Sequence, residues 1–260
     1  MIRKLTVDFS GTLSWTFVMG GLAREYHEQD RAAVAFHWLD VAEWGGVPMD
    51  PRLWNEGPIG STYPVCMAAV AAAEQGAEQA AAYLRAAREG LMCFRRKLDT
   101  TEALVEEARR AGLDVGRFRV DLGSNAIVER FGADLDVVRE IPAEARGAPG
   151  AVVEGHDGGE RLTFPSLCFT GEDGADRWVF GVGEYERYRE AAEAAGAART
   201  DGPPPGVLEA LRRFGRMATR EVAEVCGLPG PRSHAELWRL AAEWQVRPVP
   251  VLTGHLWEPA

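Results

Sequence analysis

The most reactive side chains in the sequence are four cysteines, Cys66, Cys93, Cys168 and Cys226. They lie far apart along the chain and form neither a C-x-x-C motif nor the clustered spacing of a zinc site. Isolated cysteines of this kind usually behave as small hydrophobic side chains in a protein core. We therefore predict four reduced, buried thiols and no metal centre.

A second group of polar side chains lies in a turn at residues 10–15, after an apolar segment. The candidate catalytic residues are Ser10, Thr12 and Ser14, and the candidate ligand contacts are Gly11, Leu13 and Trp15. The apolar pattern of residues 3–9 predicts a strand that ends in this turn. Apolar residues then recur at helical spacing from residue 14, which predicts a helix after the turn. The free N–H groups at such a helix start bind an anion or a thiolate. In the simpler alternative, Ser10 or Thr12 only caps the helix.

Composition limits the classes of partner. The chain has 260 residues, with a formal net charge of −10, 46% hydrophobic and 26% charged residues, as in an ordinary globular protein. A general polyanion binder needs clustered Lys and Arg, which this balance does not favour. The first residues have no apolar signal-peptide core, and no apolar run approaches the ~20 residues that cross a bilayer. We expect a cytoplasmic protein without a membrane partner.

The elements that would position these residues follow an α/β order. After the first strand and helix, the alternation of Val34, Phe36 and Trp38 predicts a strand over residues 32–39. Helices are predicted over 63–75, 77–97 and 100–112, with two shorter helices within 114–139. Residues 144–160 are expected to form a loop, followed by strands at 166–169 and 177–180 and a helix at 184–198. Residues of about 55–140 therefore form an all-α insertion.

The C-terminal part is separated by the stiff linker TDGPPPG at residues 200–206. Helices at 207–216, 219–227 and 233–245, then a ribbon turning at Thr253-Gly254, give the outline of a winged helix-turn-helix. Residues 207–260 carry seven Arg and six Glu, so DNA is a poor candidate partner. We expect the module to dock on the first domain or at a homodimer interface, with Trp238, Trp244 and Trp257 packing outward.

Four segments in order resemble the DsbA-like family, including its FrnE-type cytoplasmic members and related adaptors. They are the opening segment that ends in Ser14-Trp15, the stretch PMDPRLWNEGPIGSTYPVCMAAVAAAEQG, the stretch AAYLRAAREGLMCFRRKLDTTEALVEEARRAGLD, and Thr163-Phe164-Pro165-Ser166-Leu167. The resemblance implies a thioredoxin fold over residues 1–198, a linker at 199–206 and a winged-helix-like module at 207–260. It also implies a cis-proline at Pro165, where Thr163 and Phe164 border a peptide-binding edge.

At the centre of this resemblance the family's C-x-x-C motif is degenerate. The aligned residues are Gly11-Thr12-Leu13-Ser14, which carry no thiol. Disulfide exchange needs a thiolate to attack a sulfur atom, so this chemistry is excluded at the turn. Residues 8–10 and Ser14-Trp15 also resemble kappa-class glutathione transferases and hydroxychromene-carboxylate isomerases. Those proteins hold a thiol cofactor at this turn, which implies a glutathione- or mycothiol-like cofactor as an alternative.

Histidine adds one further candidate. His37 could serve as an acid, a base or a ligand contact near the turn, although a lone histidine is more often structural. The leading hypothesis is a redox-inactive DsbA-like protein that binds a peptide or small organic ligand between the 10–15 turn and the Phe164-Pro165 loop, with or without a non-redox reaction. The alternatives are a thiol-cofactor-dependent isomerase or transferase, and a regulatory adaptor or winged-helix transcription regulator. A homodimer that forms through the C-terminal module is a further alternative to docking on the first domain.

Overall fold

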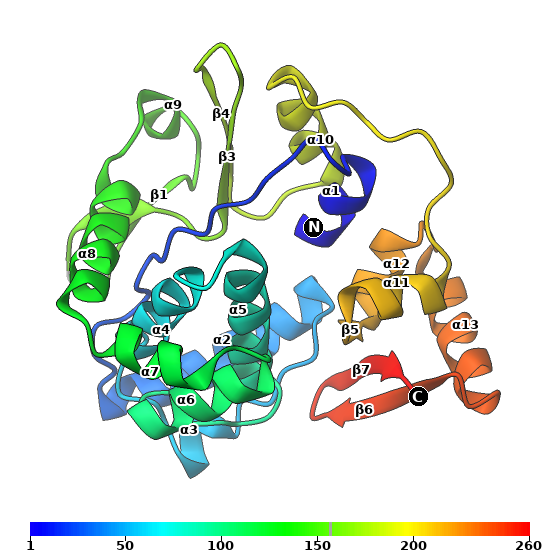
Figure 1. The fold of residues 1–260 in the computed structure, drawn as a ribbon, viewed down its shortest axis with the longest axis horizontal. Helices are drawn as coiled ribbons and strands as arrows, with labels where there is room; N and C mark the ends of the chain where they lie inside the picture. The colour runs from blue at the N-terminus through cyan, green and yellow to red at the C-terminus, as the bar shows by residue number, and fades with distance from the viewer. Residues whose placement is uncertain (156–157) are drawn as a thin grey trace.

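The structure is a computed structural model that describes residues 1–155 and 158–260 (Figure 1). The helices are α1 (Ile2–Asp8), the 3-10 helix η1 (Glu28–Asp30), α2 (Arg31–Gly45), α3 (Leu53–Glu56), α4 (Tyr63–Ala73), α5 (Ala77–Met92), α6 (Thr101–Arg110), α7 (Val115–Leu122), α8 (Asn125–Arg139), α9 (Ala143–Arg146), α10 (Tyr185–Ala194), α11 (Val207–Phe214), α12 (Thr219–Val225) and α13 (Gly230–Ala242). The strands are β1 (Val152–Glu154), β2 (Glu160–Leu162), β3 (Ser166–Thr170), β4 (Asp176–Phe180), β5 (Met217–Ala218), β6 (Val246–Val251) and β7 (Gly254–Pro259).

Helices α4 to α8 surround the largest core. Alanines on α4 are almost fully buried and let the neighbouring helices approach closely, while Tyr83, Phe118 and Phe131 fill the spaces between them. Local signals begin these helices, since the side chain of Thr100 accepts the Ala103 N–H at the start of α6 and Asp114 caps α7. The predicted helices at 63–75, 77–97 and 114–139 therefore agree with the structure to within a few residues.

A second core lies between α1, α10 and the β3–β4 hairpin. The hairpin is antiparallel and pairs Cys168 with Trp178 at its centre. Leu5 and Phe9 of the N-terminal helix pack on Phe169 and Val179. Strands β1 and β2 form a separate antiparallel pair. In the part of the chain that the structure describes, strands occur only in these two pairs and in one C-terminal sheet.

The C-terminal residues form their own core. The order is α11, β5, α12, α13, β6 and β7, and the sheet order is β5-β7-β6 with antiparallel pairing. Leu211, Met217 and Leu237 are fully buried around Trp257, whose Nε1 donates to Thr219 Oγ1 at 2.9 Å. The prediction of an outward Trp257 is therefore wrong, because this indole fills the core of its own module. Trp244, in contrast, is 87% exposed.

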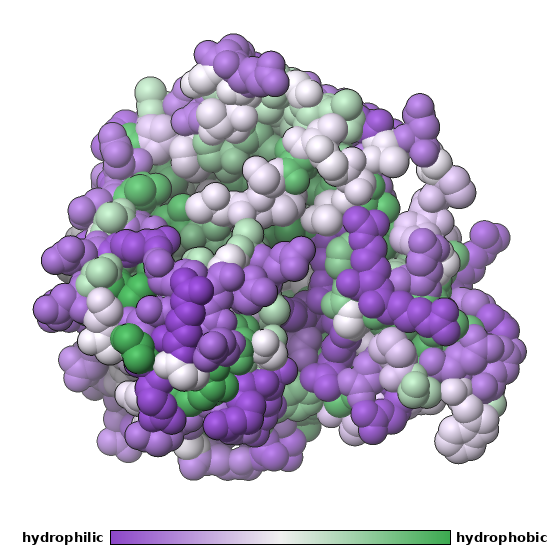
Figure 2. Space-filling view, in the orientation of Figure 1, coloured by the Kyte–Doolittle hydropathy of each residue, from purple (hydrophilic) through white to green (hydrophobic). Residues whose placement is uncertain are grey.

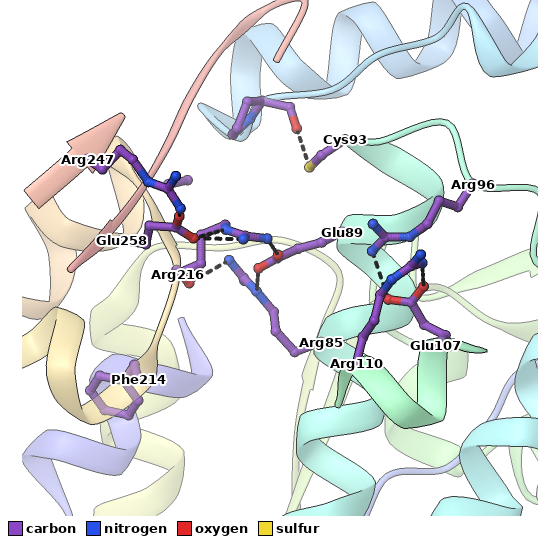
Figure 3. A network of polar contacts seen from close by, with 12 residues as sticks. Arg85, Glu89, Cys93, Arg96, Glu107, Arg110, Phe214, Arg216, Arg247 and Glu258 are labelled. Atoms are coloured by element: carbon purple, nitrogen blue, oxygen red, sulfur yellow. Dashed lines mark hydrogen bonds and ion pairs between the residues drawn. The ribbon is translucent and has the colours of Figure 1, made fainter. Parts of the chain in front are cut away.

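The C-terminal module docks on α5 and on the segment before α3, which confirms docking on the first domain. Its polar contacts centre on Arg85 and Arg216 (Figure 3). Arg85 donates to both carboxylate oxygens of Glu221 at 2.8 Å, and Arg216 joins Glu89 at 2.8 Å. Beside these ion pairs, an apolar contact joins Cys93 to Leu256 and its neighbours. Two different kinds of contact thus stabilise one interface.

Three sequence-based predictions near the N-terminus are wrong. Residues 3–9 form the helix α1 and not a strand, since Leu5 and Phe9 lie one helical turn apart and the Lys4 ammonium is 3.5 Å from Asp8. The segment after residue 14 is extended and not helical. Residues 32–39 belong to α2 and not to a strand, because Val34 and Trp38 follow helical spacing as well as alternation.

The predicted loop at 144–160 also needs correction, because it contains most of α9, all of β1 and the first residue of β2, the strand that pairs with β1. Within the described residues, no helix is long and apolar enough to cross a membrane. The same residues contain no group of three or more His, Cys, Asp or Glu side chains arranged to hold a metal ion.

Candidate functional site

The turn at residues 10–12 follows the C-terminal end of α1 and does not begin a helix. Gly11 has φ +85°, which favours glycine, and the Thr12 N–H donates to the Phe9 carbonyl at 3.1 Å. The Thr12 hydroxyl lies 3.0 Å from the Ala198 carbonyl and donates to it. A helix C-terminus carries partial negative charge. The expected anion or thiolate site at a helix start is therefore wrong, although Ser10, Gly11 and Thr12 are exposed.

Residues 13–20, called the extended segment below, run from this turn across the front of the molecule (Figure 1). Burial alternates along them: Leu13, Trp15, Phe17 and Met19 are at least partly buried, while Ser14, Thr16 and Val18 are exposed. The Met19 N–H donates to Asp134 Oδ2 at 2.8 Å. Among the described residues, the extended segment makes no backbone-to-backbone hydrogen bond. It belongs to no helix and to no sheet.

A cavity of about 220 Å³ lies between the extended segment and the helices below it. Figure 2 shows apolar residues gathered across the middle of this face, where the extended segment passes. The lining residues come from four elements and are mostly small or apolar: Trp15, Thr16, Phe17, Met19, Ala69, Val70, Ala73, Ala77, Ala80, Leu84, Arg130 and Asp134. The alanines of α4 and α5 leave the space that larger side chains would fill.

Polar groups of this cavity are few. The Trp15 indole packs edge-on against Phe169, with ring centroids 6.4 Å apart, and its Nε1 is buried with no hydrogen-bond partner in the described structure. Arg130 is paired with Glu74. Burial raises the pKa of Asp134, although the Met19 N–H and Arg130 act in the opposite direction. The site thus offers an apolar space with one free indole donor at its edge.

The Phe164-Pro165 loop meets the extended segment at its far end. The Phe164–Pro165 peptide bond is cis, and the Ser166 hydroxyl donates to the Thr163 carbonyl at 2.7 Å. A Cβ at Gly20 would lie 1.9 Å from the Phe164 ring, so any larger residue there would displace that ring. The loop therefore packs on Gly20, and no contact between Pro165 and residues 11–14 is recorded. In the sequence, the Gly20-Gly21 pair is the feature that could have indicated this close packing.

The predicted site residues thus fall into separate places. Leu13 and Trp15 pack over the core of β3 and β4, and Thr163, Phe164 and Pro165 lie at the other end of the extended segment. His37 lies on the exposed side of α2, with no recorded contact to the other candidates. Sequence reasoning missed Arg130 and Asp134, because they are more than a hundred residues away along the chain.

The cysteines do not form a redox centre. All four are free, but Cys168 is exposed and Cys66 only partly buried, so the prediction of four buried thiols is wrong for these two. Burial raises the pKa of Cys66, Cys168 and Cys226 to about 11 and that of Cys93 to about 12. A thiol needs a lowered pKa to react as a thiolate at neutral pH. These environments shift the thiols in the direction opposite to that of a catalytic cysteine.

The sequence is similar to a known family and to curated proteins. Residues 1–161 match the family model described as thioredoxin. The chain is 25% identical to the ClpXP adapter protein SpxH of Halalkalibacterium halodurans, over 99% of this chain and 82% of that protein. It is 24% identical to SpxH of Bacillus subtilis, over 99% of this chain and 82% of that protein.

Among solved structures, a putative protein disulfide isomerase from Nitrosomonas europaea superposes with a TM-score of 0.58 at 19% identity, over 74% of this chain and 86% of that one. This likeness concerns the fold alone. Since the thioredoxin family match covers more than half of the sequence, the chain belongs to the thioredoxin family.

Proposed function

We propose that this protein is a redox-inactive adapter that joins two proteins, of the kind represented by the ClpXP adapters. The observation that carries the proposal is the extent of the match, which covers 99% of this chain. An adapter match limited to the thioredoxin-like part would say nothing about the C-terminal module. Here the similarity runs through both parts and through the linker between them.

The state of the turn supports an adapter over a catalyst of disulfide exchange. Gly11 and Ser14 stand where the exchange chemistry needs thiols, and the four cysteines elsewhere have raised pKa values. A thiol cofactor is also a weak candidate, because the turn lies at the negative end of α1. A transferase or isomerase would need another group to hold the thiolate.

We further propose that a partner segment binds along residues 13–20 in an extended conformation. Its backbone would pair with the free N–H and C=O groups of the extended segment, as in β-strand addition. One apolar side chain of the partner would enter the 220 Å³ cavity beside Trp15. The Trp15 Nε1 would then donate to a partner carbonyl. This keeps a peptide as the ligand and makes a small organic molecule the weaker alternative.

The domain layout is part of this proposal. Residues 1–198 would be the DsbA-like domain with a helical insertion at about 55–140, residues 199–206 the linker, and residues 207–260 a winged-helix module in a cytoplasmic protein. The helix that would read DNA is α13, but Arg239 there is paired with both Glu236 and Glu243. A protein-contact role for the module is therefore favoured over transcription regulation.

The test is reconstitution with purified ClpXP. We expect the full chain to sediment with ClpXP at micromolar concentrations, and Trp15→Ala to weaken capture of a delivered protein without weakening the ClpXP contact. Trp244→Ala, at an equally large but 87% exposed indole, is the matched control. Absence of any complex with ClpXP would contradict the adapter proposal. Sedimentation of the free chain also tests the homodimer alternative.

A further inference from the structure

Helix α2 (Arg31–Gly45) presents a surface that the Trp15 cavity does not use. One side of α2 packs on the domain, where Ala42 is buried and the Trp38 ring contacts Trp54 with centroids 5.5 Å apart. The other side carries large apolar residues in solvent. Phe36 is 68% exposed, Trp44 56% and Leu39 38%.

These three side chains share one face. Helical geometry of 3.6 residues per turn places Leu39 about 60° to one side of Phe36 and Trp44 about 80° to the other, so the three share one broad exposed face. Ala32 and Ala33 lie on the same face toward the start of the helix and are also exposed. Large apolar side chains gathered on an exposed face mark a place where another molecule binds.

The charges on this face are of one sign. Asp40 and Glu43 lie on either side of Phe36 by helical spacing, and both are exposed. Within the described part of the chain, neither carboxylate takes part in a recorded ion pair. Glu224 on α12, by comparison, is paired with Arg220. The α2 face therefore combines three large apolar side chains with two exposed carboxylates that lie between them.

We propose that the α2 face binds a basic amphipathic helix of a partner protein. Apolar side chains of that helix would cover Phe36, Leu39 and Trp44, and its Lys or Arg residues would pair with Asp40 and Glu43. The inference rests on the proposed adapter function, which calls for two protein contacts. A second copy of this chain is a poor occupant, because two-fold pairing of α2 would bring the same carboxylates together in a protein of net charge −10.

The experiment uses the full chain and two labelled synthetic helical peptides. The first carries leucines at helical spacing, flanked by lysines; the second is identical except that glutamates replace the lysines. We expect the lysine peptide to bind at least about tenfold more tightly in fluorescence anisotropy. The double variant Phe36→Ser/Trp44→Ser should weaken that binding by tenfold or more, since buried aromatic anchors dominate such contacts.

Charge reversal and a matched control make the assignment specific. Asp40→Lys/Glu43→Lys should invert the preference, so that the glutamate peptide binds better. The control is Val120→Ser/Val128→Ser, which changes residues 74% and 56% exposed on α7 and α8 and should leave peptide binding unchanged.

Equal binding of both peptides, or unchanged binding to Phe36→Ser/Trp44→Ser, would overturn the inference. So would a dimer of the free chain that dissociates in that variant, or retention on phosphatidylcholine vesicles that the variant loses, because each assigns the face to a different occupant. Failure of the adapter function is separable: the chain would then not bind ClpXP while the peptide preference and its inversion persisted.

Discussion

The α5 interface and the α2 face differ in how completely their groups are paired. At α5, Arg85, Glu89, Arg216 and Glu258 form a continuous network that joins the C-terminal module to the helices (Figure 3). Arg85 also pairs with Glu221 of the module. On α2, two exposed carboxylates and three exposed apolar side chains have no such partners among the described residues. Both surfaces mix charge with apolar groups, but only the first is covered.

The difference teaches how to separate structure from recognition in this fold. A buried or half-buried charge without a partner costs several kcal/mol, so the α5 network must be complete for the module to dock. Exposed groups cost little free energy of folding when they are unpaired. The stability of the fold therefore does not explain why the apolar residues of α2 lie at the surface. Substitutions at the first surface should therefore change stability, and those at the second should change binding.

The largest effect is expected inside the docked module. Trp257→Ala should lower the free energy of unfolding by about 3–5 kcal/mol, because it empties a fully packed core position and leaves Thr219 without its donor. Urea unfolding followed by tryptophan fluorescence and circular dichroism measures it. Trp244→Ala, at an 87% exposed indole, should change stability by less than about 0.5 kcal/mol. Equal losses in the two variants would contradict the assignment of Trp257 to the core.

A smaller loss is expected from breaking the interface network. Arg85→Met removes the cation that binds both Glu89 and Glu221. Each of these largely buried carboxylates then keeps only its second arginine, Arg216 for Glu89 and Arg3 for Glu221. We expect a loss of about 2–4 kcal/mol, below that of a fully buried pair because Arg85 stays partly exposed. The exposed Arg220→Met is the control, since its i,i+4 pair with Glu224 contributes about 0.5 kcal/mol at most. A neutral Arg85→Met would mean that the module is held by its apolar contacts alone.

The same network predicts how stability depends on pH. Burial acts to raise the pKa of Glu221, but the guanidinium groups of Arg85 and Arg3 outweigh it and hold the pKa below its usual range. A carboxylate with a lowered folded pKa stabilises the protein above its unfolded pKa, and that contribution disappears as the pH falls through the folded pKa. The stability gap between wild type and Glu221→Gln should therefore narrow below about pH 4.5. Urea titrations at pH 7, 5 and 4 measure the gap; a constant gap would contradict the coupling.

Much of the helical fold could be predicted because its signals are local. Thr100 and Asp114 cap their helices, and the C-terminal helices and ribbon follow the predicted order. The errors at α1 and α2 arose where apolar residues fit both periods, so that tertiary contacts decided. Arg3, for example, donates to the Arg216 carbonyl 213 residues away. No local pattern records such a contact.

The candidate site was predictable only in part. The absence of any C-x-x-C motif and the position of Trp15 were visible in the sequence. Which end of a helix lies at the turn was not visible, because a Ser-Gly-Thr sequence suits both an anion site at a helix start and the C-terminus of a helix. Asp134, which fixes the Met19 N–H, comes from α8 and was visible only in three dimensions.

A further prediction concerns the reactivity of the thiols and does not depend on folding stability. Cys168 is the exposed cysteine, yet burial of its sulfur and the hydrogen bond with Asp176 raise its pKa to about 11. Its reaction with Ellman's reagent at pH 7 should be at least about tenfold slower than that of free cysteine, and should accelerate as the pH rises above 9. Cys168→Ser should remove this reaction, and the native chain should show no dithiol-oxidising activity. Rapid reaction of two thiols at pH 7 would overturn the redox-inactive reading.

The smallest expected effect on stability lies on α2. Phe36→Ser replaces a side chain that is 68% exposed, so it removes little area from the core. Serine and phenylalanine have similar helix propensities, so we expect a change within about 0.5 kcal/mol in urea unfolding. Solubility should rise, because an exposed aromatic group is lost. A loss above about 2 kcal/mol would show that Phe36 packs within this chain. That result would mean that the α2 face is covered within this chain, as the α5 interface is, and that no free surface remains there for a partner helix.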